Sequence, residues 1–238
     1  MTAPNRSTMT LPAPPATIGE RWAESDAALV ERLRGAILAD GPMTFARYME
    51  SVLYDREHGY YVTSDGRTTR EGDYLTAPEL HPIFGASLAA QIEEAWERLD
   101  RPGTFTLREE AAGSGALGLA ILDRLVAVNS PAAGAIRYLP IETDPTREAS
   151  VRERLGRAGH GARLADPDPG ASMTGVVVAN ELLDALPVHR LTVRGGDLLE
   201  VHVDWQDGWF IEVARAPSTP ALAAHLARVG VDLVEGQV

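Results

Sequence analysis

Residues 105–119 read Phe-Thr-Leu-Arg-Glu-Glu-Ala-Ala-Gly-Ser-Gly-Ala-Leu-Gly-Leu. A short strand-like run around Phe105 and Leu107 leads into the turn Gly113-x-Gly115-x-x-Gly118, and an apolar periodic segment follows over residues 119–128. Open α/β sheets use this order of strand, glycine turn and helix to present a ligand at a helix N-terminus. The glycine pattern alone is a weak signal, because ordinary loops are also rich in glycine. The neighbouring residues must therefore decide its meaning.

The residue that follows the next predicted strand gives the first such support. Residues 136–141 read as a strand, and Glu142 ends it. In nucleotide-binding sheets, an acid at the tip of the strand after the glycine loop binds ribose hydroxyls. A solvated strand end is the alternative. The sequence favours a ribose-binding role for Glu142.

Two acids directly before the loop indicate which nucleotide could bind. Glu109 and Glu110 stand where a carboxylate would repel the pyrophosphate of a dinucleotide. S-adenosylmethionine has no phosphate and carries a sulfonium and an α-ammonium, which an acid attracts. The acids therefore favour a methyl donor, and an NAD(P)-dependent oxidoreductase is the alternative that uses the same loop.

Composition excludes several classes of site. The 238 residues include no cysteine, and all 22 basic residues are arginine, so thiolate chemistry, a Schiff-base lysine and a P-loop lysine are excluded. A formal net charge of −12 argues against nucleic acid or an anionic membrane as the partner. The six histidines show no ligand spacing, so no metal site is predicted.

The remaining pattern predicts the organisation of the chain. Residues 1–20 are rich in Pro, Ala, Ser and Thr and lack a signal-peptide core, so we expect a disordered tail and a cytoplasmic protein without membrane insertion. Helical periodicity predicts a helical extension over residues 21–100. Residues 101–238 are expected to form an α/β domain, with an antiparallel β-meander inserted at 188–214.

A polar segment follows the buried strand predicted at residues 175–179. It contains Asn180, Glu181 and Asp184. Polar groups just past the carboxyl end of such a strand face the ligand crevice of an open sheet. The alternative is a helix capped by Asn180 with solvated acids.

These residues together resemble the MidA-like family of class I S-adenosylmethionine-dependent methyltransferases. Its mitochondrial members assist the assembly of respiratory complex I by methylating an arginine of one of its subunits. Besides the glycine loop and Glu142, the matching stretches are Gly41–Met49, Tyr54-Asp55 with Gly59-Tyr60-Tyr61, Gly72–Glu79 with Phe84-Gly85, and Ala179–Val188.

The resemblance implies a Rossmann-like class I sheet and S-adenosyl-L-methionine as cofactor. Because family members continue further, we expect this sheet to be C-terminally incomplete. The implied cofactor residues are Glu109, Ala111, Gly113 and Gly115 around the methionine part, Glu142 at the ribose, Asp166 at the adenine edge, and Asp73 and Thr76 in a segment covering the pocket.

The resemblance also implies a protein substrate with an accessible arginine. Glu181 would be the main ligand of its guanidinium, with Asp184 second and Asn180 holding the cofactor or the acceptor. Two departures give weight to an alternative, a non-catalytic assembly protein with a degenerate methyltransferase fold. Ala111 replaces the family's first loop glycine, and Glu110 replaces an apolar residue. Alanine at a site that needs φ > 0 would strain the turn by ~1 kcal/mol.

Overall fold

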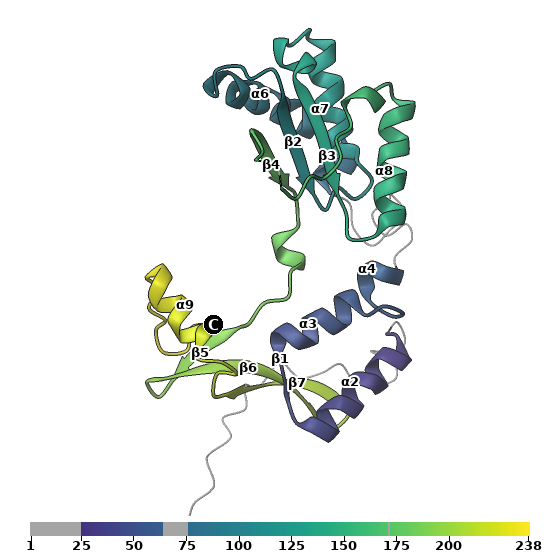
Figure 1. Ribbon diagram of the computed structural model, residues 1–238. Coiled ribbons are helices and arrows are strands. Elements are labelled where there is room, and N and C mark those ends of the chain that lie inside the picture. The colour runs from purple at the N-terminus through teal and green to yellow at the C-terminus, as the bar shows by residue number, and fades with distance from the viewer. Residues whose placement is uncertain (1–24, 64–75, 171) are drawn as a thin grey trace, which may run out of the picture. The chain divides into compact units, whose positions relative to one another are not determined.

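The computed structural model describes residues 25–63, 76–170 and 172–238 and divides the chain into two units (Figure 1). Unit 1 consists of Met1–Asp65 and Leu186–Val238, and unit 2 consists of Gly66–Ala185. Along the chain, unit 2 is therefore inserted between two parts of unit 1. Within the described ranges, no helix is long and apolar enough to cross a membrane.

Unit 2 contains a parallel sheet with the order β3-β2-β4. Its strands are β2 (Phe105–Glu110), β3 (Ile136–Ile141) and β4 (Gly175–Ala179). They are flanked by the helices α6 (Ile83–Arg98), α7 (Ala116–Ala127) and α8 (Pro145–Arg157) (Figure 1). The smaller elements are α5 (Ala77–Leu80), η1 (Pro131–Gly134), η2 (Gly161–Arg163) and η3 (Leu183–Ala185). The parallel strands joined by helices confirm the predicted Rossmann-like α/β class.

The core of unit 2 lies between β2, β3 and the helices. On β2, the two-residue period of a strand puts Phe105 and Leu107 on the buried face, and both are fully buried. Each such side chain contributes about 1.5–3 kcal/mol through burial. Helices α6 and α7 pack so closely that a Cβ added at Gly85 would lie only 2.6 Å from the Cβ of Ala120.

Two details of this sheet bear on the predictions. The segment after α8 forms the 3-10 helix η2, and Leu164, which follows it, makes a single parallel bridge with Tyr138 at the outer side of β3. Among the described residues, β4 pairs with β2 on one side only, and Val177 is 57% exposed.

Unit 1 is built on an antiparallel sheet centred on β6. Its strands are β1 (Met43–Thr44), β5 (Leu191–Arg194), β6 (Asp197–Gln206) and β7 (Trp209–Arg215). The two predicted hairpin turns are confirmed, because Gly195, Gly196, Asp207 and Gly208 all adopt positive φ, as tight hairpin turns require. Helix α9 (Ala221–Val229) follows the meander.

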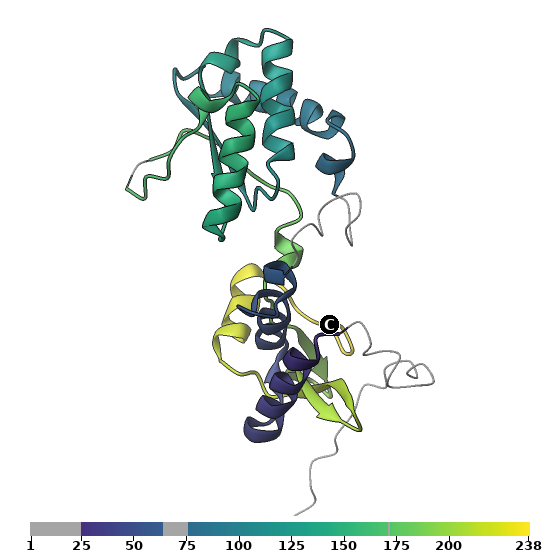
Figure 2. The same cartoon turned by 90° about the vertical axis from the view of Figure 1, so that its right-hand side faces the viewer.

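Helices α2 (Ala27–Asp40) and α3 (Phe45–Tyr54) cover one face of this sheet (Figures 1 and 2). Thr44 caps α3 by accepting a hydrogen bond from the Arg47 N–H at 3.2 Å. The helices and the sheet share one hydrophobic core, which contains the buried side chains of Leu29, Leu33, Ile37, Met43 and Val203.

The grouping of segments differs from the expected domain bounds. The meander was expected within the α/β domain, but β6 pairs with β1 through Met43 and Val203 and therefore joins the N-terminal helices. Helix α6 was expected in the N-terminal extension, but it packs on α7 in unit 2. The physical reason is the same in both places: strand pairing and close helix contact join segments that are distant along the chain.

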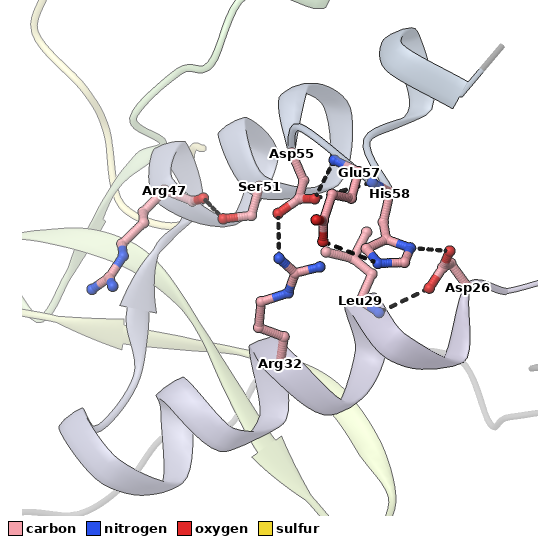
Figure 3. A network of polar contacts seen from close by, with 8 residues as sticks. All are labelled: Asp26, Leu29, Arg32, Arg47, Ser51, Asp55, Glu57 and His58. Atoms are coloured by element: carbon pink, nitrogen blue, oxygen red, sulfur yellow. Dashed lines mark hydrogen bonds and ion pairs between the residues drawn. The ribbon is translucent and has the colours of Figure 1, made fainter. Parts of the chain in front are cut away.

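A polar network fixes the turn after α3 onto α2 (Figure 3). The Asp55 carboxylate accepts hydrogen bonds from the N–H groups of Glu57 and His58, each at 3.0 Å, and its other oxygen lies 3.1 Å from Arg32. His58 Nδ1 lies 2.6 Å from an oxygen of Asp26, which also caps α2. The short helix α4 (Tyr60–Thr63) follows this turn.

Candidate functional site

The glycine loop joins β2 to α7 through residues in left-handed backbone conformations. Ala111, Gly113 and Gly115 have φ of 53°, 58° and 75°. The positive φ of Ala111 confirms that this position is the strained one for a residue with a Cβ. Gly115 is required for a second reason, since a Cβ there would lie 2.8 Å from Val151 Cγ1 of α8. The sequence therefore places a tight turn directly at the start of α7.

Glu109 lies inside the protein at the base of this loop. It continues the buried face of β2 and is 4% exposed. The Tyr138 hydroxyl donates to its Oε2 at 2.7 Å, and the Gly118 N–H also interacts with its carboxylate. Burial raises the pKa of Glu109 to about 7, although these two donors act in the opposite direction. Glu109 can therefore change its charge near neutral pH.

Glu142 stands beside the loop at the end of β3. The parallel register of Glu110 with Ile141 brings the ends of β2 and β3 level. The Gly113 N–H donates to Glu142 Oε1 at 2.5 Å. Burial raises the pKa of the Glu142 carboxyl, while Gly113 and Arg147 lower it. The structure thus brings Glu142 to the glycine loop, as the sequence predicts.

Glu110 points away from Glu109, because consecutive strand residues face opposite sides of the sheet. Its carboxylate pairs with Arg108 Nε at 2.5 Å. This pair explains how an acid occupies a position where an apolar residue was expected. Glu110 is therefore paired with an arginine, whereas Glu109 lies on the opposite face of the strand.

The segment before α6 contacts the loop through Glu79. The Glu79 carboxylate accepts a hydrogen bond from the Ser114 hydroxyl, and Arg154 of α8 donates to Ser114 O and Oγ, both at 2.9 Å. Of the two predicted residues of this segment, Thr76 directly precedes α5. Asp73 lies outside the described residues.

The predicted adenine-edge residue, Asp166, is tied to α8. Its side chain is 90% exposed and lies 3.0 Å from Arg152 Nη1. Arg152 also donates to the carbonyl of Ala165 at 2.8 Å, which fixes the local backbone. The adenine role of Asp166 therefore stays a prediction.

The predicted acceptor residues follow β4 at the same edge of the sheet as the loop. Ala179, the last residue of β4, is in register with Glu110 at the end of β2. Glu181 has φ of 51°, and a three-residue 3-10 turn, η3, contains Asp184. The α-helical spacing that would put Glu181 and Asp184 on neighbouring faces is therefore not formed. Both side chains are exposed, and Asn180 is half-buried.

The sequence interpretation missed four residues of this region: Tyr138, Ser114, Glu79 and Arg154. One signal for Tyr138 was available, since a tyrosine in a buried strand needs a partner for its hydroxyl. The contacts of Ser114, Glu79 and Arg154 depend on the packing of three separate segments. In the part of the chain that the structure describes, no group of three His, Asp or Glu side chains could hold a metal ion.

Comparison with known proteins adds a family to this geometry. Residues 87–238 match the family described as "Putative S-adenosyl-L-methionine-dependent methyltransferase". The Drosophila melanogaster protein named "Protein arginine methyltransferase NDUFAF7 homolog, mitochondrial" is 30% identical over 201 residues, covering 74% of this chain and 45% of its own length. The mouse protein arginine methyltransferase NDUFAF7 is 28% identical, covering 86% of this chain and 53% of its own.

A solved structure is also similar. A protein from Burkholderia thailandensis, crystallised with S-adenosyl-homocysteine, matches with a TM-score of 0.71 and 33% identity, covering 95% of this chain and 58% of that one. The chain spans about half the length of the curated relatives that it matches.

Proposed function

The chain belongs to the S-adenosyl-L-methionine-dependent methyltransferase family, and from that premise we propose that it binds S-adenosyl-L-methionine in unit 2 and methylates an arginine of a partner protein. The observation that carries the proposal is the pair of acids at the glycine loop, the buried Glu109 and the half-buried Glu142. The relatives named as arginine methyltransferases support the choice of acceptor.

The chemistry of these residues fits this cofactor. Glu142, next to the Gly113 amide, offers a carboxylate that can accept hydrogen bonds from the ribose hydroxyls. Glu109 offers a second carboxylate for the positive charge of the methionine part. A pyrophosphate at the same loop would face both acids, and this repulsion argues against NAD(P). When bound, the cofactor supplies an electrophilic methyl group.

The acceptor residues would orient the guanidinium. An arginine side chain is a cation at any physiological pH, and its nitrogens are poor nucleophiles because the charge is delocalised. A carboxylate that binds two of them orients the group and keeps positive charge away from the third. Glu181 is our first candidate for this role and Asp184 the second, because both follow β4 at the edge where the loop lies. Asn180 would hold the cofactor or the acceptor through its amide.

Cofactor binding is tested by calorimetry with S-adenosylhomocysteine and, separately, NADH. The wild type is expected to bind the first and not the second. Glu142→Ala should weaken binding by about 1.5–3 kcal/mol, the range for hydrogen bonds to a charged group. Glu153→Ala is the matched control, since Glu153 pairs only with Arg157 on α8 in the described contacts. Tight NADH binding would overturn the proposal.

The loop alignment has its own test. Ala111→Gly should strengthen cofactor binding, because glycine adopts the φ of 53° without strain. Weaker binding by this variant would show that the loop has been matched to the family incorrectly.

The acceptor role is tested with Glu181→Gln. Cofactor affinity should be nearly unchanged, while methyl transfer to an arginine-bearing protein falls at least tenfold, about 1.4 kcal/mol of transition-state stabilisation. Unchanged transfer would place the acceptor site elsewhere. If the wild type binds cofactor but methylates no arginine protein, the non-catalytic assembly protein becomes the better account. A cytoplasmic location stays a prediction.

A further inference from the structure

Tyr138 lies under the glycine loop, and the function proposed above gives it no role. Its side chain is fully buried on β3, and its hydroxyl lies 2.7 Å from Glu109 Oε2. The register pairs Tyr138 with Leu107, two residues before Glu109 on β2. The phenol ring therefore extends along the sheet until its hydroxyl reaches the acid.

Gly118 of α7 makes this arrangement possible. A Cβ at Gly118 would lie 2.4 Å from Cζ of Tyr138 and 2.5 Å from its hydroxyl oxygen, so only glycine leaves space for the ring. The N–H of Gly118, in the first turn of α7, also interacts with the Glu109 carboxylate. First-turn N–H groups of a helix have no partner inside the helix and favour a negative charge. The third glycine of the loop pattern thus admits the tyrosine and donates to the acid.

We infer that Tyr138 is a positioning residue, which holds the Glu109 carboxylate oriented and ionised for the cationic methionine part of the cofactor. This inference rests on the cofactor binding proposed above. A buried carboxylate needs donors to keep its charge, and the Tyr138 hydroxyl supplies one.

The surrounding charges agree with this role. Burial raises the pKa of Glu109 to about 7, and the Tyr138 hydrogen bond lowers it. Glu142 lies close enough to raise it further. Burial raises the pKa of Tyr138, and the positive charge of Arg154 on α8 lowers it. Without the hydroxyl, Glu109 would stay protonated to a higher pH, and a cation would bind less tightly at neutral pH.

The test compares wild type, Tyr138→Phe and Tyr48→Phe by calorimetry with S-adenosylmethionine from pH 6 to pH 9. Wild-type affinity should rise as pH increases through about 7. For Tyr138→Phe we expect about fivefold weaker binding at pH 7 and nearly normal binding at pH 9. Tyr48→Phe removes a hydroxyl from α3 in unit 1 and should behave as wild type. The ligand titrates equally against all three proteins, so differences between the profiles come from the protein.

The outcomes separate the two proposals. A pH-independent loss in Tyr138→Phe would mean that the tyrosine only supports the fold, and a flat wild-type profile would overturn the inference without any variant. If the wild type binds no cofactor at any pH, the proposed function fails. The inference is then tested by measuring unfolding at different pH values. The stability that protonated Glu109 contributes should be lost at a higher pH in Tyr138→Phe than in the wild type. An unchanged pH dependence would mean that the inference is wrong.

Discussion

Each unit contains a pair of carboxylates in a polar network, and the two networks shift the pKa values of these carboxylates in opposite directions. In unit 1, hydrogen bonds from the Leu29 N–H and His58 lower the pKa of Asp26, and the N–H groups of Glu57 and His58 lower that of Asp55. In unit 2, burial raises the pKa of both Glu109 and Glu142.

The difference comes from what surrounds each acid. Asp26 is exposed and Asp55 is partly exposed, and their contacts with backbone N–H groups, Arg32 and His58 lower their pKa values more than partial burial raises them (Figure 3). Glu109 is buried, and its donors among the described residues are neutral, the Tyr138 hydroxyl and the Gly118 N–H. Ionised acids with enough hydrogen-bond donors stabilise a fold. A buried acid with too few donors instead indicates a functional site, where a ligand supplies the missing contact to the carboxylate.

The largest effect is expected from Glu109→Gln. The folded pKa of Glu109, about 7, lies above its ordinary value of 4.5, so the folded state binds the proton more tightly. Its contribution to stability is full below pH 4.5 and is lost as pH rises through 7. Replacing it by a neutral isostere should stabilise unit 2 by about 3 kcal/mol at pH 8 and by little at pH 4.

Urea unfolding at pH 8 and pH 4 measures this difference in stability. It is followed by the fluorescence of Trp96 in α6, in a chain whose other tryptophans are replaced by phenylalanine. The same variant should lose cofactor affinity, so stability and binding change in opposite directions. A variant that is less stable than wild type at pH 8 would contradict the contrast between the units.

A smaller effect is expected from two helical glycines. Gly118→Ala forces Tyr138 out of its place and should destabilise unit 2 by about 1–3 kcal/mol, the cost of overpacking. Gly35→Ala in α2 is the matched control, because nothing lies within 4 Å of the added Cβ. It should stabilise unit 1 by about 0.5–1 kcal/mol. Thermal melts of both variants test the pair, and equal effects would show that Gly118 is not required by the ring.

The smallest effect concerns acid unfolding of unit 1. Because the folded pKa values of Asp26 and Asp55 are lowered from 3.8, their stabilisation is present above that pH and is lost as pH falls through the folded values. Tryptophan fluorescence from Trp205 should report a falling melting temperature below pH 4. Asp55→Asn should flatten this fall, while Glu50→Gln, at an exposed position on α3, should leave the profile as it is in wild type.

Local sequence patterns predicted most elements, because each element is determined by neighbouring residues. The strand around Phe105 and Leu107 and the helix after the glycine turn were each predicted correctly. The partners of the elements could not be predicted in this way. No local pattern indicates that Met43 pairs with Val203, or that Leu164 forms a single bridge with Tyr138.

The candidate site shows the same difference between residues that local sequence predicts and contacts that depend on the pairing of distant segments. Glu142 was predicted because its place after a strand has a known meaning in open sheets, and the structure brings it to Gly113. Glu109 was predicted by charge, but its burial and its bond to Tyr138 depend on the register between two strands. Glu181 and Asp184 do not lie on one α-helix, because Glu181 takes a positive φ, which ends regular structure before η3 begins.

The insertion of unit 2 within unit 1 also affects how the chain folds during synthesis. Met43 of β1 leaves the ribosome before unit 2, and its partner Val203 leaves after it. At about 5–20 residues per second, the apolar faces of α2 and α3 wait on the order of ten seconds for the sheet that covers them. Unit 2, whose contacts are contiguous in sequence, can fold in that interval. Newly made α2 and α3 are therefore the segments of this protein that we expect chaperones to bind.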